Sequence, residues 1–423
     1  MRIAIVGAGV SGLVAAHLLH REHEIVVYEA GSYAGGHTNT IRVDTTYETH
    51  HVDTGFIVMN DRNYPNFTRL LDRLGVARQA THMSFSVSGA DEDFEYSGTP
   101  RGLLCQPRNL ISPRFQRMIA DLLRFNRELR RLLTQHESDG SLSDESLGEF
   151  LVRRRFSRVF VERLVVPQVS AVWSADPREL YSFPARFLAE FFANHGMLGF
   201  CDRPRWSTVA GGSARYVEAL TRPFQQRIRL NCAVSSIARL PDHVELTVTG
   251  QAGGRDTEYF DQVILATHSD QALSLLRDPS ERETRLLGAI PYQRNEAVLH
   301  TDSSLLPRRR GARAAWNFHL LREPKPLSTV TYYMNHLQRL RADRDFCVTL
   351  NRTEAIDPAH IIATFDYAHP VYTAQGVAAQ AEHASLGGLE RRTHYCGAYW
   401  GWGFHEDGVV SALRACAPFG VML

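Results

Sequence analysis

The chain has 423 residues, of which 44% are hydrophobic and 22% charged, the composition of an ordinary globular protein long enough for two or three domains. Its formal net charge of +1 provides no field that favours nucleic acid, and no apolar run reaches the length that spans a membrane. The six cysteines include no C-x-x-C pair, which argues against a disulfide framework or a zinc site. A first predicted strand at residue 2 leaves no room for a signal peptide, so we expect a cytoplasmic protein without a resident metal.

The N-terminal segment predicts a strand, a glycine turn and a helix. A β-branched run over Arg2–Val6 is followed by Gly7-Ala8-Gly9-Val10-Ser11-Gly12 and then by helical spacing of apolar residues. In such a turn Gly7 permits the tight bend, Gly9 lets a pyrophosphate approach bare backbone, and Gly12 lets the helix pack closely on the strand. The phosphates, with Ser11 beside them, would lie at the helix N-terminus, where free N–H groups favour negative charge.

A second strand over Ile25–Tyr28 ends in an acidic residue at the spacing that a dinucleotide site needs. Glu29 follows Gly7 by 22 positions (29 − 7), and its carboxylate can bind both hydroxyls of an adenosine ribose. A glycine pattern alone also occurs in tight turns of ordinary βαβ units. Because strand, turn, helix, strand and acid occur here in register, the sequence predicts a dinucleotide site.

The next stretch distinguishes FAD from NAD. Gly31-Ser32-Tyr33-Ala34-Gly35-Gly36-His37-Thr38 follows Glu29 and Ala30, and His51-Val52-Asp53-Thr54-Gly55 comes after it. The glycine pair lets backbone pass close under a flat, bulky ligand. These motifs resemble the flavin-containing amine oxidase and carotenoid desaturase superfamily, in which the pair usually precedes arginine. His37 stands in its place, so a charge near the flavin or its phosphates becomes pH-dependent or absent. The resemblance implies cofactor contacts at Ala30, Gly35, Gly36, His37, Thr38 and Gly55.

The region after Gly55 is expected to enter a substrate domain. Helical spacing predicts helices over Tyr64–Leu74, Pro113–Leu133 and Ser146–Phe160, with the polar segment 136–141 between the last two. The helix over Pro113–Leu133 is amphipathic and rich in arginine. It could dock on anionic lipid headgroups, or it could present a solvated face in a chain whose basic residues are almost all arginine; we favour the second interpretation.

Aromatic residues are dense between Val165 and Phe200. They could line an apolar substrate tunnel, although core is the commoner fate of such residues. Asn194-His195-Gly196 is a polar insertion in this stretch. As a lone histidine, His195 is expected to be satisfied structurally rather than to reach the tunnel.

The chain is then expected to return to the cofactor. Trp206–Ser213 contains a further glycine pair, and Asp261–Thr267 predicts a strand beneath the dinucleotide. Arg229–Ile237 predicts another strand, in which, by the resemblance, the backbone at Val234 would contact the adenine. Alternating segments between residues 290 and 375 are expected to form the sheet of the substrate domain.

Thr393–Ser411 predicts a strand, a loop of glycine and aromatic residues, and a helix that begins near Gly408. In the superfamily Gly397 would face the pyrophosphate and ribityl region. The N–H groups around Gly408 and Val409 would stabilise negative charge on the reduced flavin, as suits a helix N-terminus. The expected fold is α/β, with a Rossmann-type FAD-binding domain from residues 1–60, 205–290 and 390–423 and an interleaved α+β substrate domain from residues 61–204 and 291–389.

Further stretches resemble a bacterial group of predicted FAD-dependent oxidoreductases: Asn194–Gly196, Tyr292–Asn295 with Leu299–Asp302, and the loop from Gly397 to Gly408. Some members of that group are associated with methyltransferases of the cyclopropane-fatty-acid-synthase type and with furan fatty acid formation. The resemblance implies that the flavin takes a hydride from a C–H bond of an apolar substrate, with desaturation of a methylated fatty acyl chain as the favoured reaction. The partner would be an apolar small molecule or a phospholipid acyl chain, reached by peripheral contact with the inner face of the membrane. The electron acceptor stays open.

His405 is the first candidate for a base over the flavin face. Glu406, Tyr399 and Trp400 are weaker candidates whose alternative roles are capping and packing. Amine oxidation is the closest alternative reaction, disfavoured because the chain's only lysine, Lys325, lies in a loop-like, proline-flanked segment. A polyunsaturated fatty acid isomerase or a carotenoid-type desaturase would use the same fold and hydride chemistry. A non-enzymatic escort protein is disfavoured because the flavin motifs are retained.

Overall fold

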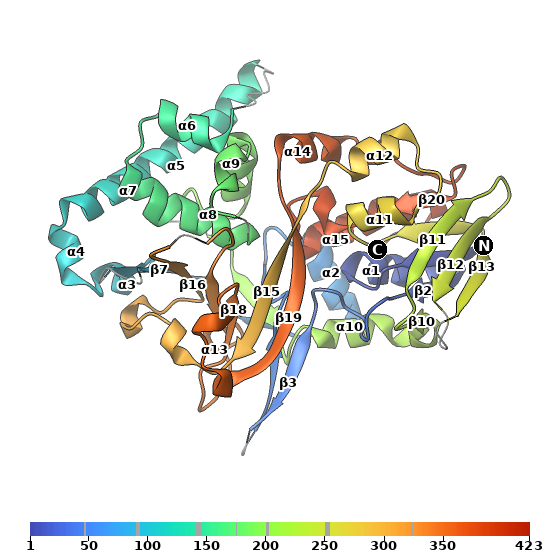
Figure 1. Cartoon of the computed structure of the whole chain (residues 1–423), viewed down its shortest axis with the longest axis horizontal. Coiled ribbons are helices and arrows are strands. Elements are labelled where there is room, and N and C mark those ends of the chain that lie inside the picture. The colour runs from blue at the N-terminus through green and yellow to red at the C-terminus, as the bar shows by residue number, and fades with distance from the viewer. Residues whose placement is uncertain are drawn as a thin grey trace.

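The computed structural model describes residues 1–45, 48–89, 94–139, 145–174, 176–199, 203–249, 254–323 and 325–423; Phe200, at the end of the aromatic stretch, lies outside them. Figure 1 shows two lobes with a long antiparallel sheet between them. One lobe holds both chain termini and a parallel sheet, and the other is a group of helices. Among the described helices, none is both long and apolar enough to cross a bilayer.

The parallel sheet is built from the start, the middle and the end of the chain. Its strands run in the order β10-β2-β1-β14-β20, and every neighbouring pair is parallel. Their bounds are β10 Ile228–Arg229, β2 Glu24–Tyr28, β1 Arg2–Val6, β14 Gln262–Leu265 and β20 Thr393–Tyr395. Sheets of this kind bind ligands at the carboxyl ends of their strands. The segments that follow β1, β2, β14 and β20 therefore meet at one edge.

Helices cover one face of the parallel sheet, and a small antiparallel sheet with further helices covers the other. Successive residues of β1 serve the two faces: Ile3 and Ile5 are fully buried in one core, and Ala4 in the other. The first core contains α1 Val10–Leu19, α2 Pro65–Leu74, α10 Ala214–Thr221 and α15 His405–Cys416. The second contains β11 Val234–Arg239, β12 Val244–Thr249, β13 Arg255–Phe260, α11 Ser269–Leu275, α12 Glu281–Leu287 and α14 Ala374–Ala381.

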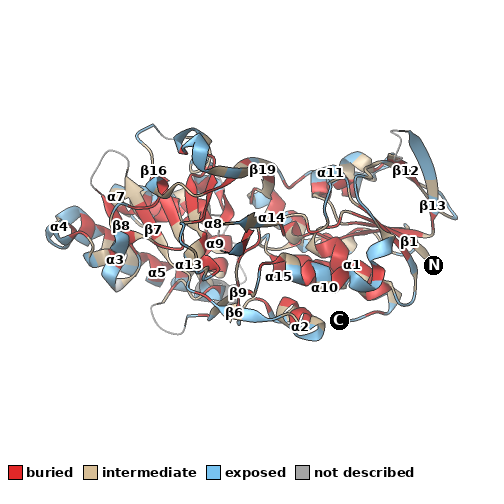
Figure 2. Ribbon diagram, turned by 90° about the horizontal axis from the view of Figure 1, so that it is seen from below, coloured by how far each residue is buried: buried red, intermediate tan, exposed pale blue. Residues whose placement is uncertain are grey.

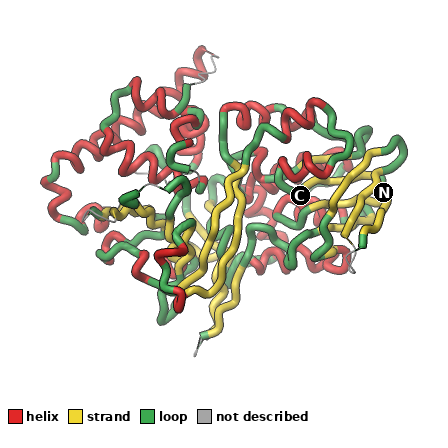
Figure 3. Tube along the Cα trace, in the orientation of Figure 1, coloured by secondary structure: helices red, strands yellow, loops and turns green. Residues whose placement is uncertain are grey.

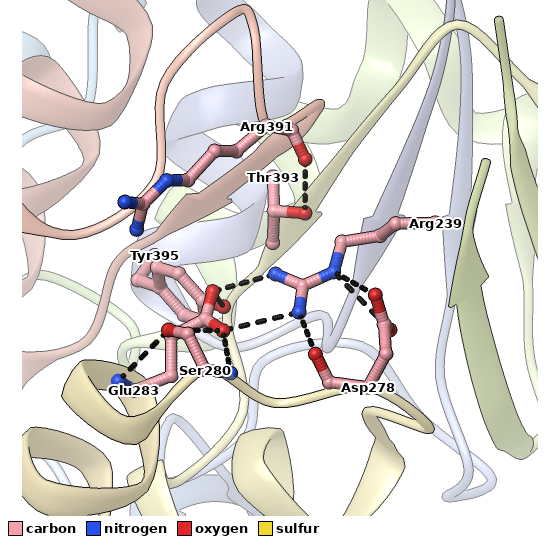
Figure 4. A network of polar contacts seen from close by, with 7 residues as sticks. All are labelled: Arg239, Asp278, Ser280, Glu283, Arg391, Thr393 and Tyr395. Carbon is pink, nitrogen blue, oxygen red and sulfur yellow. Dashed lines mark hydrogen bonds and ion pairs between the residues drawn. The ribbon is translucent and has the colours of Figure 1, made fainter. Parts of the chain in front are cut away.

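A buried ion pair holds the second of these layers together (Figure 4). The carboxylate of Glu283 on α12 accepts hydrogen bonds from Arg239 Nη1 at 2.6 Å, Arg239 Nη2 at 3.0 Å and Tyr395 Oη at 2.6 Å. Burial alone would raise the pKa of Glu283, but these hydrogen bonds outweigh it and lower the pKa to about 2. One carboxylate thus joins a helix to strands of two sheets.

The antiparallel sheet between the lobes has seven strands in the order β19-β15-β18-β17-β16-β7-β8. Only β16 and β7 pair in parallel among these described strands. Their bounds are β19 Ile361–Pro370, β15 Tyr292–His300, β18 Cys347–Leu350, β17 Val330–Tyr333, β16 Trp316–Leu320, β7 Phe85–Gly89 and β8 Glu95–Ser97. The strands expected between residues 290 and 375 are confirmed, and they run along the boundary between the lobes (Figure 3).

The helices of the helical lobe have buried inner faces (Figure 2), and the core between them is rich in phenylalanine. Phe125, Phe150, Phe160 and Phe183 are among its fully buried side chains. Its helices are α3 Pro100–Leu104, α4 Pro107–Ile111, α5 Pro113–Asp139, α6 Leu147–Arg153, α7 Arg158–Phe160, a π-helical turn Val161–Val165, α8 Val166–Trp173 and α9 Ala185–Asn194.

Shorter elements connect the lobes. They are the hairpin of β3 Thr40–Asp44 and β4 Thr49–Asp53, the small sheet of β5 Met59–Asn60, β9 Trp206–Val209 and β6 Arg78–Ala80, and α13 Met334–Leu337.

Four element boundaries differ from the sequence prediction. α5 continues to Asp139 through part of the expected polar linker, whose residues 140 and 141 lie outside the described chain. The helix expected over 146–160 breaks between α6 and α7, where Arg155 adopts φ +51°. The strand expected over 229–237 is divided by a turn at Asn231, φ +52°, a conformation that asparagine tolerates. α15 begins at His405 rather than near Gly408.

Candidate functional site

The three glycines in the turn between β1 and α1 differ in the space around them. Gly7 adopts φ +102°, and a Cβ there would lie 2.8 Å from the carbonyl oxygen of Ala266. A Cβ at Gly12 would lie 1.9 Å from the carbonyl oxygen of Gly7. At Gly9, in contrast, a Cβ would meet no atom within 4 Å. The protein itself requires Gly7 and Gly12, whereas the space at Gly9 is open to a ligand at the N-terminus of α1.

Glu29 closes the other side of this turn at the end of β2. Its Oε2 accepts a hydrogen bond from Ala8 N at 2.8 Å, and its Oε1 accepts one from Gly31 N at 2.8 Å. Each oxygen keeps a lone pair for a further donor, such as a ribose hydroxyl. Glu29, Ala30 and Val234 all line the cavity that begins here, together with Ser11.

The glycine pair lies against the phosphate turn. Gly35 N donates to Ala8 O at 2.8 Å, and a Cβ at Gly36, φ +59°, would lie 3.1 Å from Gly9 Cα. Gly55 lies under the same loop, since a Cβ there would be 2.1 Å from His37 O. Larger residues at these positions would push the loop away from the turn and open the crevice.

Three histidines gather on one wall of the cavity. The ring centroid of His37 lies 5.3 Å from that of His369 on β19 and 6.3 Å from that of His268, which follows β14. Burial, and then the neighbouring imidazoles, lower the pKa of His37 well below its usual value. Burial likewise lowers the pKa of His369 to about 4. The position at which the resemblance implies an arginine therefore holds a neutral imidazole.

This wall fits a bound FAD. Nε2 of His37 is buried and has no hydrogen-bond partner among the described residues, an arrangement that a ligand oxygen would complete. The open space at Gly9 and the spare acceptor sites of Glu29 lie in the same cavity. The residues present therefore suit the diphosphate and the ribose of the dinucleotide.

His405 is held inside a hydrogen-bond network. Its Nε2 lies 2.9 Å from both Thr38 Oγ1 and Tyr216 Oη, and its ring stacks on Phe56 with centroids 3.5 Å apart. Burial lowers the pKa of His405 to about 3. His405 lines the cavity, where Thr38 and Tyr216 already contact its Nε2, and its expected role as a base stays a prediction. Thr38 lies outside the cavity lining and positions His405.

The three weaker catalytic candidates differ in whether they line the cavity. Tyr399 lines the cavity, and burial raises its pKa well above the usual value, so its hydroxyl stays protonated. Glu406 lies outside the lining: its carboxylate accepts from Asn66 N at 3.1 Å and Phe67 N at 2.9 Å and so caps α2. Trp400 also lies outside the lining and stacks on His383 at 4.3 Å. Glu406 and Trp400 thus have the capping and packing roles that were their alternatives.

The closing segment differs from the expectation for Gly408 and Val409. Gly408 N donates to Phe404 O at 3.1 Å, and Val409 is fully buried, so neither presents a free N–H to the cavity. Asp407 Oδ2 accepts from Phe404 N at 2.9 Å, which starts α15 early and moves the free N–H groups to its first turn. A Cβ at Gly408 would lie 2.7 Å from Val10 Cγ1, so close packing on α1 explains this glycine. Gly397 does line the cavity.

The cavity continues from the cofactor crevice into the helical lobe, with a total volume of about 1470 Å³. The inner part is a chamber with apolar walls that include Leu122, Leu164, Val172, Trp173, Phe191 and Phe192. His195 also lies on this wall. Its Nδ1 is 2.9 Å from Phe191 O, its ring stacks on Phe191 at 3.9 Å, and burial lowers its pKa to about 4. The aromatic stretch therefore supplies both core and cavity wall.

Sequence reasoning missed His268, Tyr367 and His369. They lie on β19 or just after β14, far along the chain from the motifs that they contact. Tyr367 Oη lies 2.7 Å from Thr54 Oγ1, next to Gly55. The one available signal was the Thr267-His268 pair after a buried strand, at the edge where such sheets bind ligands.

Comparison with known proteins agrees with this architecture. The sequence profile of flavin containing amine oxidoreductases matches residues 10–418. The mitochondrial protoporphyrinogen oxidase of Nicotiana tabacum is 30% identical over 194 residues, which is 43% of this chain and 35% of that protein. The chain thus matches only about a third of the length of this curated relative.

Solved structures share the whole fold at low identity. Cyclohexylamine oxidase from Brevibacterium oxydans IH-35A superposes with a TM-score of 0.64 at 15% identity, covering 98% of both chains. The fatty acid isomerase of P. acnes that produces CLA superposes with a TM-score of 0.63 at 14% identity, covering 99% of this chain and 98% of the other. With the profile match over nearly the whole length, these likenesses place the protein in the family of flavin-containing amine oxidoreductases, as an FAD-dependent enzyme.

Proposed function

We propose that this enzyme removes hydrogen from a C–H bond of an apolar substrate, and that the substrate is a fatty acyl chain. The observation that carries this proposal is the apolar chamber joined to the cofactor crevice. A cavity of about 1470 Å³ exceeds the roughly 300–1,000 Å³ of a typical small-molecule site and leaves room for a dinucleotide and a second molecule. Aliphatic and aromatic walls favour a substrate without charge at the reacting end.

FAD supplies the hydride acceptor when it is bound. The chain must then position the C–H bond and take up the accompanying proton, and His195 replaces His405 as our candidate for the second task. Because Phe191 O can only accept, Nδ1 of His195 carries the proton and Nε2 is an acceptor. Burial also lowers the pKa of His195, to about 4, so its candidacy rests on the tautomer: the neutral ring presents Nε2 as the acceptor of a hydrogen bond or a proton from the substrate.

Two other substrate classes compete. Amine oxidation is compatible with the family, but Lys325 lies outside the cavity lining, where its Nζ pairs with Glu354. The curated relatives oxidise a porphyrinogen by name, so a porphyrinogen is the second candidate. Both the fatty acyl and the porphyrinogen reactions take hydrogen from an apolar molecule, and the same experiment separates them.

The test is anaerobic mixing of the FAD-loaded enzyme with candidate substrates while the visible absorbance of the flavin is followed. Fatty acids and phospholipids with saturated, monounsaturated and methyl-branched chains should bleach the flavin, and mass spectrometry should find products two hydrogens lighter. Bleaching by a porphyrinogen, cyclohexylamine or putrescine but by no acyl lipid would reject the proposal. A polyunsaturated acid that changes its double-bond positions without net bleaching would instead identify an isomerase.

A matched pair of variants tests the chamber. Val172→Glu places a charge on the chamber wall, whereas Val152→Glu places the same charge on a side chain that is 78% exposed. We expect Val172→Glu to abolish bleaching by lipid with little change in FAD content, and Val152→Glu to behave as the native enzyme. Equal activity of both variants would show that the substrate does not enter the chamber.

Membrane contact stays a proposal of its own. Four of the six arginines of α5 pair with acids: Asp121 binds Arg117 and Arg124, and Glu128 binds Arg127 and Arg131. Exposed apolar side chains lie instead on α3 and α4, where Leu104 and Ile111 are 56% and 81% exposed. We expect vesicles that contain anionic phospholipid to bind the native protein more tightly than the Ile111→Glu variant in a flotation assay.

A further inference from the structure

Two segments that touch the phosphate turn each deliver a histidine to the cavity. His37 follows Gly36, whose Cβ position lies 3.1 Å from Gly9 Cα. His268 follows Thr267, whose backbone nitrogen lies 3.3 Å from the Cβ position of Gly7. Both imidazoles therefore start one residue away from a direct contact with the turn that receives the phosphates.

β19 contributes the third imidazole, that of His369, and the position of its proton can be assigned. Nδ1 of His369 lies 2.9 Å from Asn295 Nδ2, and the amide of Asn295 is oriented because its Oδ1 accepts from Asn351 Nδ2 at 2.7 Å. His369 Nδ1 therefore accepts, and the proton of the neutral ring lies on Nε2. His37 contributes an unpartnered Nε2, while a backbone hydrogen bond with Ala368 engages the ring. The wall thus holds one ready N–H donor and one nitrogen that becomes a donor on protonation.

The surrounding charges keep this cluster neutral until an anion arrives. The acidic groups nearby are Glu29, which two backbone N–H groups already bind, Asp366 of β19, and Asp270, which raises the pKa of His268 against the larger effect of burial. Arg294 of β15 lines the same cavity and His405 of α15 faces His37, and both oppose further positive charge. Tyr292 stacks on His268, and Tyr367 on His37, as uncharged rings. The negative charge of a bound diphosphate would instead favour the protonated form of these histidines.

We propose that His37, His268 and His369 bind the diphosphate of FAD and take up protons from solvent as the cofactor binds. An anion is the ligand that this cluster fits, because His369 Nε2 carries a proton and His37 Nε2 has no hydrogen-bond partner among the described residues. In the protonated form, the imidazoles provide the positive charge that an arginine guanidinium would provide at any pH. The inference concerns the cofactor and does not depend on the substrate.

The pH dependence of FAD binding follows from the protonation of the three histidines without and with FAD. Without FAD the cluster is neutral above about pH 6.5, since burial lowers the pKa of all three histidines from the ordinary value and neighbouring imidazoles lower those of His37 and His369 further. With FAD the negative charge raises these pKa values, so binding is strongest at low pH and weakens as the pH rises through the raised values. Each linked proton makes the dissociation constant rise about tenfold per pH unit in that window.

The experiment is calorimetric titration of FAD into the full-length protein after removal of its flavin, in HEPES and in Tris at several pH values. Because the two buffers differ in ionisation enthalpy, the difference in heat gives the number of protons taken up. We expect uptake of about one proton near neutral pH. The variants His37→Gln, His268→Gln and His369→Gln should each reduce the uptake, and His37→Arg should reduce it while keeping FAD affinity at high pH.

His195→Gln is the matched control, because it removes another buried cavity histidine that does not contact the cluster. It should retain the native proton uptake. Circular dichroism and thermal unfolding of each flavin-free variant establish that it folds. An absence of net uptake in the native protein, or an uptake that persists in all three glutamine variants, would overturn the inference, whatever the lipid assays show.

Discussion

Replacing Gly9 with alanine separates what the cofactor needs from what the fold needs. The added methyl group would meet no atom within 4 Å, and Gly9 adopts φ −75° and ψ −179°, which alanine accepts. The free energy of unfolding of the flavin-free protein should therefore stay within about 1 kcal/mol of the native value. Two small effects oppose each other, since alanine restricts the unfolded chain but is a poorer N-cap of α1 than glycine.

The same methyl group would occupy the space through which the diphosphate approaches the N-terminus of α1. We expect the loss of two charge-assisted hydrogen bonds from backbone N–H groups, at about 1.5–3 kcal/mol each. FAD binding should then weaken by about 3–6 kcal/mol, which corresponds to roughly a hundredfold to ten-thousandfold in the dissociation constant. The substitution should therefore weaken FAD binding strongly and change the stability of the flavin-free protein little.

Two measurements test this separation. Urea unfolding followed by circular dichroism gives the stability without flavin, and quenching of flavin fluorescence gives the affinity. Gly12→Ala is the comparison variant, because its Cβ would lie 1.9 Å from Gly7 O and should destabilise the protein even without FAD. The reasoning fails if Gly9→Ala binds FAD as tightly as the native protein, or if it loses as much stability as Gly12→Ala.

Three further predictions concern groups with a fixed role in the fold. Glu283→Gln should lower the free energy of unfolding by about 3–5 kcal/mol at pH 7, since Arg239 loses its buried partner. Because the pKa of Glu283 is lowered to about 2, this difference should vanish as the pH falls from about 4.3 through that value; a difference that persists below pH 2 contradicts the assignment. Glu406→Ala should cost about 0.5–2 kcal/mol through the lost cap of α2 and leave substrate turnover intact, and lost turnover with native stability would restore it as a catalytic candidate. The imidazole nitrogens of His405, assigned by comparison with His405→Gln, should show no protonation step between about pH 5 and 8 in nitrogen NMR spectra, because burial lowers its pKa to about 3.

Features carried by contiguous residues could be predicted from the sequence in detail. β1 spans Arg2–Val6, the turn follows at Gly7, and Glu29 lies at the end of β2, all as expected. Each of these depends on a run of neighbouring residues whose periodicity and glycine positions have few structural solutions. The parallel sheet could be predicted for the same reason, since its central strands are short, buried and uniformly apolar.

Features that depend on pairing between distant segments could not be predicted. His369 reaches His37 because β19 pairs with β15 in a register that places His369 opposite Gln293, and one residue of slip would turn it to the other face. The start of α15 depends on a side-chain cap from Asp407, which spacing alone does not reveal. The hydrogen bond between His405 and Tyr216 could not be predicted for the same reason, because Tyr216 lies on α10.

Asp53 joins three separate elements directly beside the cavity. Its buried carboxylate accepts from Ser213 N at 2.8 Å, Gln338 Nε2 at 2.8 Å and Thr40 Oγ1 at 2.5 Å, which joins the start of α10, the end of α13 and the β3–β4 hairpin. Burial raises the pKa of Asp53 to about 7 although these hydrogen bonds oppose it, so the protein accepts an electrostatic cost at this junction. Thr54 and Gly55, the next two residues, line the cavity. A displacement of these elements that breaks the Asp53 contacts would therefore move Thr54 and Gly55, and with them this part of the cavity wall.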